Sequence, residues 1–341
     1  MPEHPEQAVC CEERIDGRTL SGRERFLKTL RREPVSGRVP TFELEFYLTM
    51  EAFGRVHPSH RRFGQWGQMS QRERELQLRD QAETFVAFAR KYHHSAIHVN
   101  GVSGGGVDGK IRVLELIREM AGDEFALLVY CDPTFGIPDG QRMMSFTERL
   151  YEDQAGLHEE ARRSTDRTLR ETERIARTGL LDGVCMCSDY CFNANPFFSR
   201  SMFSEFIAPY LTESIRACHA FGLLCIKHTD GNILPLVDLM VDCGPDALHS
   251  LDPQGGVDLA QISREWGDKV ALCGNVNCAL LQTGSPEDCA ADVRRALRDG
   301  MARNRGYVFC TSNCAYTGLP LERYEMMHDI WYAEGIYPPA G

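Results

Sequence analysis

Short apolar runs alternate with longer amphipathic runs along most of the chain, and this alternation restricts the fold more than any other feature of the sequence. Eight of the short runs have the length and the apolar, β-branched character of buried strands. The runs between them have the 3.6-residue periodicity of helices. The expected strands cover residues 39–46, 95–100, 125–131, 183–189, 223–228, 247–251, 270–275 and 307–311.

Strands that alternate with helices indicate an α/β protein with a parallel sheet. No glycine-rich fingerprint follows the first expected strand, so a doubly wound dinucleotide-binding sheet is disfavoured. Eight strand–helix units predict a (β/α)8 TIM barrel instead. The chain of 341 residues is longer than a plain barrel, and the excess falls mostly in residues 47–94 and 132–146. We expect a disordered leader at residues 1–19 and a single barrel domain at residues 20–341.

Composition excludes several classes of protein. The formal net charge of −11 argues against a nucleic-acid binder and against binding to an anionic membrane surface. No apolar run approaches the roughly 18 residues of a membrane span, and the acidic N-terminus lacks the layout of a signal peptide. The 14 cysteines are scattered, many of them in strand-like runs, which favours reduced thiols and a cytoplasmic location.

Polar residues gather at the C-terminal ends of the expected strands, where barrel enzymes place their chemistry. This pattern supports the fold more than any specific reaction, because loops are often polar. The residues at these ends are Glu43, Glu45, Tyr47, His98, Asn100, Asp132, Ser188, Asp189, His228, Asp230, His249, Asp252, Asn275, Asn277, Ser312, Asn313 and Cys314.

The segment CIKHTDGNI, residues 225–233, contains the sharpest motif. Residues i and i+2 of a strand share a face, so His228 and Asp230 project together. The fifth and eighth strands lie across the mouth of a barrel, so Cys314 can join them. Imidazole, carboxylate and thiolate are all zinc ligands, and three protein ligands with an open position make a catalytic site. A simple His–Asp hydrogen bond beside an inert cysteine explains the same spacing, and both interpretations stay open on the spacing alone.

Several long segments resemble the uroporphyrinogen decarboxylase superfamily. The longest runs from CSDYCFNANP to CGNVN, residues 187–277. The others are RERFLKTLRREPVSGRVP at residues 23–40, GYVFCTSNC at residues 306–314 and PLERYEMM at residues 320–327. The resemblance implies a (β/α)8 barrel. It also implies one of two chemistries, which are cofactor-free decarboxylation of uroporphyrinogen and zinc-dependent methyl transfer to or from a corrinoid protein.

The segment after the first strand separates these two branches. True decarboxylases carry an arginine-rich motif there, which binds the carboxylates of the tetrapyrrole. This chain has TFELEFYLTM, with Glu43 and Glu45 in place of arginines. Acidic groups would repel such a substrate, so the resemblance is closer to the methyltransferase and demethylase branch. Decarboxylation of a tetrapyrrole or another carboxylate is kept as the alternative.

The methyltransferase branch binds zinc through a His-x-Cys pair on the fifth strand and a distant cysteine after the eighth. His228 matches the histidine, and Cys314 lies where the distant cysteine belongs. Asp230 stands in place of the middle cysteine. A carboxylate leaves zinc a harder Lewis acid than a second thiolate would, which fits an O-methyl substrate better than a thiol. The resemblance therefore implies His228, Asp230 and Cys314 as metal ligands.

The remaining roles follow from position in the barrel and from the resemblance. Asp189 is expected to orient the substrate or to act as a general acid, and Glu45 to be a base or a further ligand. Tyr47, Asn100 and Asn275 are expected to line the substrate pocket. The expected cofactors are Zn²⁺ and methylcobalamin, a corrinoid carried by a partner protein. Neither a nucleic acid nor a membrane is expected as a partner, and the sequence leaves the oligomeric state open, a homodimer being one option.

Overall fold

Seven parallel strands form one curved sheet in the computed structural model, which describes residues 14–15 and 18–337. Their order in the sheet, β10-β9-β8-β7-β6-β5-β4, is the order of the chain. Six of these strands lie within a segment that the sequence predicts to be a strand, and β7 extends one residue beyond the predicted 223–228. The strands are β4 (Ala96–His98), β5 (Ala126–Tyr130), β6 (Gly183–Cys187), β7 (Leu224–Thr229), β8 (Ala247–Ser250), β9 (Ala271–Cys273) and β10 (Tyr307–Val308).

The first expected strand, residues 39–46, does not form a regular strand, yet the segment takes the eighth place in the barrel. The backbone N–H of Phe309 donates to the carbonyl of Pro40 at 2.9 Å, and that of Ser95 donates to the carbonyl of Thr41 at 2.6 Å. The segment is therefore hydrogen-bonded to the chain just after β10 on one side and to the chain just before β4 on the other. These bonds close the sheet, and the predicted TIM-barrel fold is confirmed.

Along residues 39–46, hydrogen bonds that involve side chains replace some of the backbone hydrogen bonds expected between neighbouring strands. The Nδ1–H of His98 donates to the carbonyl of Leu44 at 2.8 Å. The backbone N–H of Thr311 donates to Oε1 of Glu43 at 3.3 Å. Because these backbone groups are bonded to side chains rather than to a neighbouring strand, the regular strand pattern is lost here.

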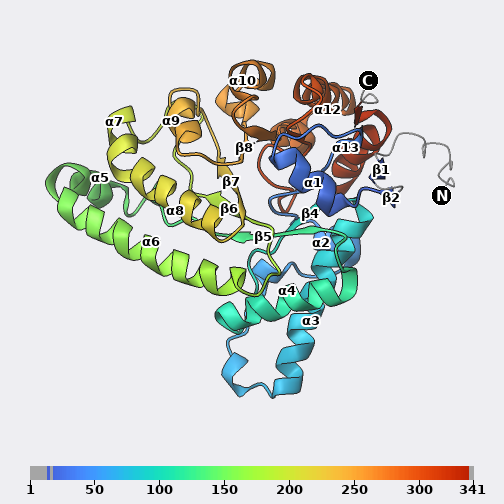
Figure 1. Cartoon of the computed structure of the whole chain (residues 1–341), viewed down its shortest axis with the longest axis horizontal. Coiled ribbons are helices and arrows are strands. Elements are labelled where there is room, and N and C mark those ends of the chain that lie inside the picture. Colours follow the sequence, from blue (N-terminus) through green and yellow to red (C-terminus); the bar gives the residue numbers. More distant parts are fainter. Residues whose placement is uncertain (1–13, 16–17, 338–341) are drawn as a thin grey trace.

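Helices cover the outer face of the sheet, and α1 covers its N-terminal end (Figure 1). In α1, Phe26 and Leu30 pack against Phe42 and close the base of the barrel interior. Ser285 caps α12 with Pro286 in its first turn, as the sequence predicts. The helices are α1 (Gly22–Leu30), α2 (Thr49–Phe53), α3 (Gln71–Lys91), α4 (Gly106–Ala121), α5 (Met143–Glu152), α6 (Gln154–Ala176), α7 (Arg200–Met202), α8 (Ala208–Ala220), α9 (Val237–Asp242), α10 (Leu259–Trp266), α11 (Cys278–Thr283), α12 (Pro286–Met301) and α13 (Leu321–Glu334).

Two apolar cores lie on the two faces of the sheet. Side chains such as Leu128, Cys185 and Ile226 fill the interior of the barrel. A larger cluster packs between the sheet and the outer helices and includes Cys225 and Cys218. The cysteines that the structure describes are all free thiols. The period-two alternation of each strand therefore divides its residues between the two cores.

Two short antiparallel pairs lie outside the barrel sheet. Arg14–Ile15 (β1) pairs with Arg18–Thr19 (β2), and Gly37–Arg38 (β3) pairs with Ile336–Tyr337 (β11). Most of the expected leader, residues 1–13 and 16–17, lies outside the described residues, so its boundary stays a prediction. Within residues 14–15 and 18–337, no helix combines the length and the apolar character needed to cross a membrane.

Candidate active site

The C-terminal ends of β6 and β7 bring three ligand-type side chains together. Cys187 pairs in register with His228, so the residues two positions further on, Asp189 and Asp230, also face the barrel mouth. Nε2 of His228 lies 3.6 Å from Oδ1 of Asp189 and 3.8 Å from Oδ1 of Asp230. The side chains of His228, Asp230 and Asp189 are 6%, 25% and 46% exposed, so this three-residue cluster opens toward solvent on the Asp189 side.

Asp230 combines one bonded oxygen with one that has no partner. Its Oδ2 accepts a hydrogen bond from the side-chain amide of Asn313. Its Oδ1 is buried and has no hydrogen-bond partner among the described residues. Burial, with the charge of Asp189 as a second cause, raises the pKa of Asp230 to about 7. A buried oxygen without a partner next to an imidazole nitrogen is a place for a cation or a hydrogen-bond donor.

The second nitrogen of His228 is held by another histidine. Nδ1 of His228 lies 2.8 Å from Nδ1 of His249, its neighbour in the register between β7 and β8. Burial lowers the pKa of His228 to about 4 and that of His249 well below its usual range, so both rings are neutral at pH 7. Nε2 of His249 and Nε2 of His98 are buried without a partner among the described residues.

Close packing of two turns fixes the loop that follows Asp230. Gly231 has φ +79°, and a Cβ on Gly255 would lie only 2.2 Å from the carbonyl carbon of Gly231. The backbone N–H of Gly231 also donates to Oδ2 of Asp252 at 3.3 Å. Ser250 and Leu251, at the end of β8, both have positive φ, 63° and 54°. Backbone strain of this kind concentrates at functional sites, where the surrounding structure holds it in place.

A buried ion pair fixes the segment that carries Asp189. Nζ of Lys227 lies 2.8 Å from Oδ2 of Asp132, and both side chains are 0% exposed. Oδ2 of Asp132 also accepts from the backbone N–H of Ser188 at 2.9 Å, and Lys227 donates to the carbonyl of Ser188 at 2.9 Å. The ring of Tyr190 lies 4.2 Å from Nζ of Lys227. Both chain neighbours of Asp189 are therefore held by buried groups.

Polar groups on another side of the barrel mouth come from residues 39–46, from Tyr47 just after them, and from the residues that follow β4. The side-chain amide of Asn100 donates to Oε1 of Glu45, and burial raises the pKa of Glu45. Tyr47 packs against the rings of His57 and His60, with centroid distances of 4.9 and 4.6 Å. The proposed roles of Glu45, Asn100 and Tyr47 toward a substrate stay predictions.

Glu43 is placed differently from what its sequence position suggests. It is 3% exposed, and its Oε2 accepts a hydrogen bond from Oγ1 of Thr311 at 2.5 Å. Burial raises the pKa of Glu43 to about 8, so the carboxyl is mostly protonated at pH 7. Repulsion of an anionic substrate therefore depends on Glu45 rather than on both glutamates.

Cys314 and Asn275 are not among the three residues that the structure brings together at the barrel mouth. Cys314 is half-buried and does not belong to the described ligand groups whose atoms all lie within 4.8 Å of one another. Asn275 is fully buried, its amide donates to the carbonyl of Leu251 at 2.7 Å, and its Oδ1 accepts from Arg295 at 3.0 Å. Its polar atoms thus stabilise the scaffold. Ligation by Cys314 and substrate contact by Asn275 stay predictions.

The sequence did not reveal that His249 and Asn313 contact the cluster residues. Both were recognised as polar residues at strand ends, but their partners were not. The contact between His228 and His249 depends on the β7–β8 register, and that between Asn313 and Asp230 on the loop after β10. Alternation within each strand could indicate only that His249 faces the interior.

A second ligand-type group lies at the opposite end of β7 and consists of His219, Cys225 and Asp246. Oδ2 of Asp246 is 2.8 Å from Nε2 of His219 and accepts from the backbone N–H of Cys225 at 2.7 Å. This carboxylate is already bonded, and it joins α8 to the start of β7. We interpret the group as structural.

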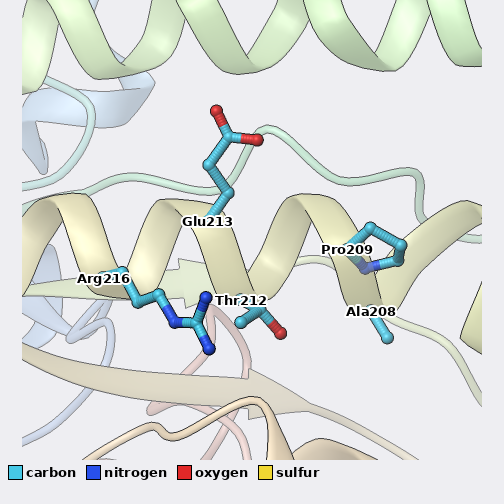
Figure 2. Close-up of a pocket in the computed structure, with 5 residues that line it drawn as sticks. All are labelled: Ala208, Pro209, Thr212, Glu213 and Arg216. Atoms are coloured by element: carbon cyan, nitrogen blue, oxygen red, sulfur yellow. The ribbon is translucent and has the colours of Figure 1, made fainter.

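Two surface hollows differ in their relation to the cluster. One lies on α8 and is lined by Ala208, Pro209, Thr212, Glu213 and Arg216 (Figure 2). The other, with a volume of about 320 Å³, lies between residues 134–138 and α5. The backbone N–H of Ile137 donates to the carbonyl of Asp189 at 2.8 Å, so this second hollow, the α5 cleft, adjoins the loop of Asp189.

Comparisons with known proteins agree with the fold. The family model described as Uroporphyrinogen decarboxylase (URO-D) matches residues 137–333. A methyltransferase from Methanosarcina mazei superposes with a TM-score of 0.69 at 16% identity, over 92% of this chain and 99% of that chain. A GH5_18 protein from Bifidobacterium longum subsp. infantis has a TM-score of 0.46 at 11% identity, over 89% of this chain and 80% of that chain. No curated protein sequence is significantly similar to the chain. The identity with the methyltransferase is low, so this likeness shows the barrel fold and not the reaction.

Proposed function

The chain belongs to the uroporphyrinogen decarboxylase (URO-D) family, and from this premise we propose that it transfers a methyl group between a small methylated substrate and a corrinoid carried by a partner protein. The observation that carries the proposal is the position of His228 Nε2, which faces the carboxylates of Asp189 and Asp230 at the barrel mouth. The shared fold with a methyltransferase supports it.

Zinc is the metal that the family resemblance implies for this branch, and two of the expected ligands fit it. His228 is 6% exposed and turns Nε2 toward the carboxylates, and Oδ1 of Asp230 is buried without a partner among the described residues. His228 and Asp230 would therefore hold the ion. When bound, zinc supplies a Lewis acid that polarises the atom carrying the methyl group.

The protein's own groups would orient the side chains of this site. Asn313 holds Oδ2 of Asp230, His249 holds Nδ1 of His228, and the Lys227–Asp132 pair fixes the loop of Asp189. Rigid ligands reduce the reorganisation that accompanies reaction. Asp189 is the most exposed member of the three-residue cluster, so a substrate that enters from solvent would reach the cluster on this side.

The donor set favours an oxygen-bound methyl group as the substrate. Carboxylate ligands leave a metal ion a harder Lewis acid than thiolates do, and a hard ion activates an oxygen leaving group better than a sulfur one. Transfer would break the C–O bond with its electron pair on oxygen, which would take a proton from solvent, while the reduced corrinoid would supply the electron pair that bonds the methyl carbon.

Transfer to free corrinoid tests the proposal. Purified protein is incubated with zinc, reduced cobalamin and a panel of methoxylated aromatic and aliphatic compounds, and methylcobalamin is followed by its absorbance. We expect methylation of cobalamin with at least one O-methyl compound and its loss in His228→Ala and Asp230→Asn. Asp246→Asn, at the opposite end of β7, is the matched control and should retain activity.

A parallel assay with uroporphyrinogen covers the alternative. Release of CO₂ from uroporphyrinogen, without any methyl transfer across the panel, would overturn the proposal in favour of decarboxylation. The corrinoid protein as partner, the cytoplasmic location and the oligomeric state stay predictions.

A further inference from the structure

The three-residue cluster has the geometry of a set of metal ligands. Nε2 of His228 makes no hydrogen bond among the described residues, although its ring is 6% exposed, and the nearest carboxylate oxygens lie 3.6 and 3.8 Å away. Ligands about 2.1 Å from a tetrahedral ion are separated by about 3.4 Å. Only small side-chain movements are needed to place one ion between Asp189, His228 and Asp230.

Three hydrogen bonds hold Asp189 and its chain neighbours in this arrangement. Its Oδ1 accepts from the backbone N–H of Asp230 at 3.0 Å, which points the carboxylate at the turn after β7. The backbone N–H of Tyr190 donates to Oγ1 of Thr229 at 2.9 Å, and Ser188 is held by Asp132. The loop is therefore preorganised by buried bonds that belong to the scaffold.

The loop after β10 contacts the cluster through a side-chain amide. The side chain of Asn313 donates to Oδ2 of Asp230. The neighbouring residue, Cys314, has its carbonyl within 3.7 Å of Sγ of Cys278 and lies outside the group of three. The amide thus occupies the side of Asp230 from which the loop approaches.

We propose that Asp189, His228 and Asp230 form the metal site of this chain, with one imidazole and two carboxylates, and that Cys314 is not a ligand. This inference deepens the proposed function because it concerns the donor set of the same site. A ligand set of one nitrogen and two charged oxygens neutralises a divalent ion and leaves further positions open for a substrate oxygen. The thiol of Cys314 then lies beside the site without binding the ion.

Metal binding by the full chain tests the inference without any methyl substrate. Protein freed of metal with a chelator is titrated with Zn²⁺ by calorimetry and, separately, with Co²⁺ in an absorption spectrometer. We expect one equivalent to bind and the Co²⁺ complex to lack the thiolate-to-metal charge-transfer band of the near ultraviolet. Because the spectrum is recorded on the unaltered protein, it does not depend on whether a variant folds.

Three variants make the assignment specific. Asp189→Asn should weaken Zn²⁺ binding by about 100-fold or more. Replacing a residue that only holds a ligand in place already weakens metal binding by about 10- to 100-fold, and loss of a ligand costs more. Cys314→Ser and Asp246→Asn should bind as the unaltered protein does. A thiolate band, loss of binding in Cys314→Ser, dependence on Asp246, or no binding at all would each overturn the inference. Methyl transfer is not measured in these experiments, so the failure of the metal site and that of the proposed reaction are distinguished.

Discussion

The Nδ1 atoms of His228 and His249 lie 2.8 Å apart, so one of the two neutral rings donates a proton to the other. When His228 is the donor, its Nε2 keeps a lone pair, and that lone pair faces Asp189 and Asp230. A histidine that ligates a metal commonly has its other nitrogen fixed in this way. The tautomer of His228 at the barrel mouth is therefore coupled to that of His249 on β8.

Replacing His249 therefore changes metal affinity without removing a ligand. We expect His249→Phe to weaken Zn²⁺ binding by about 10- to 100-fold, because the phenyl ring offers no acceptor to Nδ1 of His228. His249→Asn is the matched variant, since its Oδ1 can accept the same proton, and it should recover most of the affinity. Equal losses in the two variants, measured by calorimetry, would contradict this role.

The buried pair of Lys227 and Asp132 is expected to contribute strongly to folding. Removing one partner leaves a charge without compensation in a site that is 0% exposed. We expect Lys227→Met to lower the free energy of unfolding by about 3–5 kcal/mol. The double variant with Asp132→Asn should be less destabilised than the single one, since no lone charge remains. Urea denaturation measures both, and additive losses would refute the coupling.

Glu43 is expected to make stability fall as the pH rises. Burial raises its pKa from 4.5 to about 8, so between these values the folded state keeps a proton that the unfolded state has lost. The stabilisation is complete below pH 4.5 and disappears as the pH passes through 8. The free energy of unfolding of the unaltered protein minus that of Glu43→Gln should decline over this window. A constant difference across the window would show that the carboxyl is ionised in the fold.

His94 is expected to produce the opposite dependence in acid. Burial lowers its pKa from 6.5 to about 3, so the folded state holds the neutral ring. Its contribution is complete above pH 6.5 and is lost as the pH falls toward 3, because the unfolded chain binds the proton first. The ring nitrogen Nε2 lies 3.1 Å from the hydroxyl of Tyr324, a contact that His94→Gln can retain. Denaturation from pH 7 to pH 4 should show a smaller loss of stability in the variant, and equal losses would exclude His94 as a cause.

Gly255 is expected to be intolerant of a side chain. A Cβ there would lie 2.2 Å from the carbonyl carbon of Gly231, in the turn that follows Asp230. We expect Gly255→Ala to cost about 1–3 kcal/mol of stability and to weaken Zn²⁺ binding as the turn shifts. Gly67→Ala is the control, because nothing lies within 4 Å of its Cβ position, and it should leave both properties unchanged. Normal Zn²⁺ affinity in Gly255→Ala would show that the packing of this turn does not affect metal binding.

Much of the barrel could be predicted because its signals are local. Each apolar run with flanking helical periodicity indicates a strand, and seven of the eight expected segments contain a strand of the sheet, although β4, β9 and β10 are shorter than predicted. The remaining segment, residues 39–46, fills its place without regular strand geometry. The carbonyl of its Leu44 accepts from the side chain of His98, and the side chain of its Glu43 accepts from the backbone N–H of Thr311. Both partners lie far from this segment in the sequence, so no local pattern encodes these bonds.

For the site, too, the features that follow from local pattern could be predicted, and those that depend on the fold could not. Alternation along a strand is a property of the backbone, so the sequence was enough to place His228 and Asp230 on one face and Asp189 just after the preceding strand. Their partners come from the tertiary fold, in which His249 lies against the imidazole of His228 and the amide of Asn313 donates to Oδ2 of Asp230. These contacts depend on strand register and on loop packing, which arise from the summed burial of the whole barrel and not from any one segment.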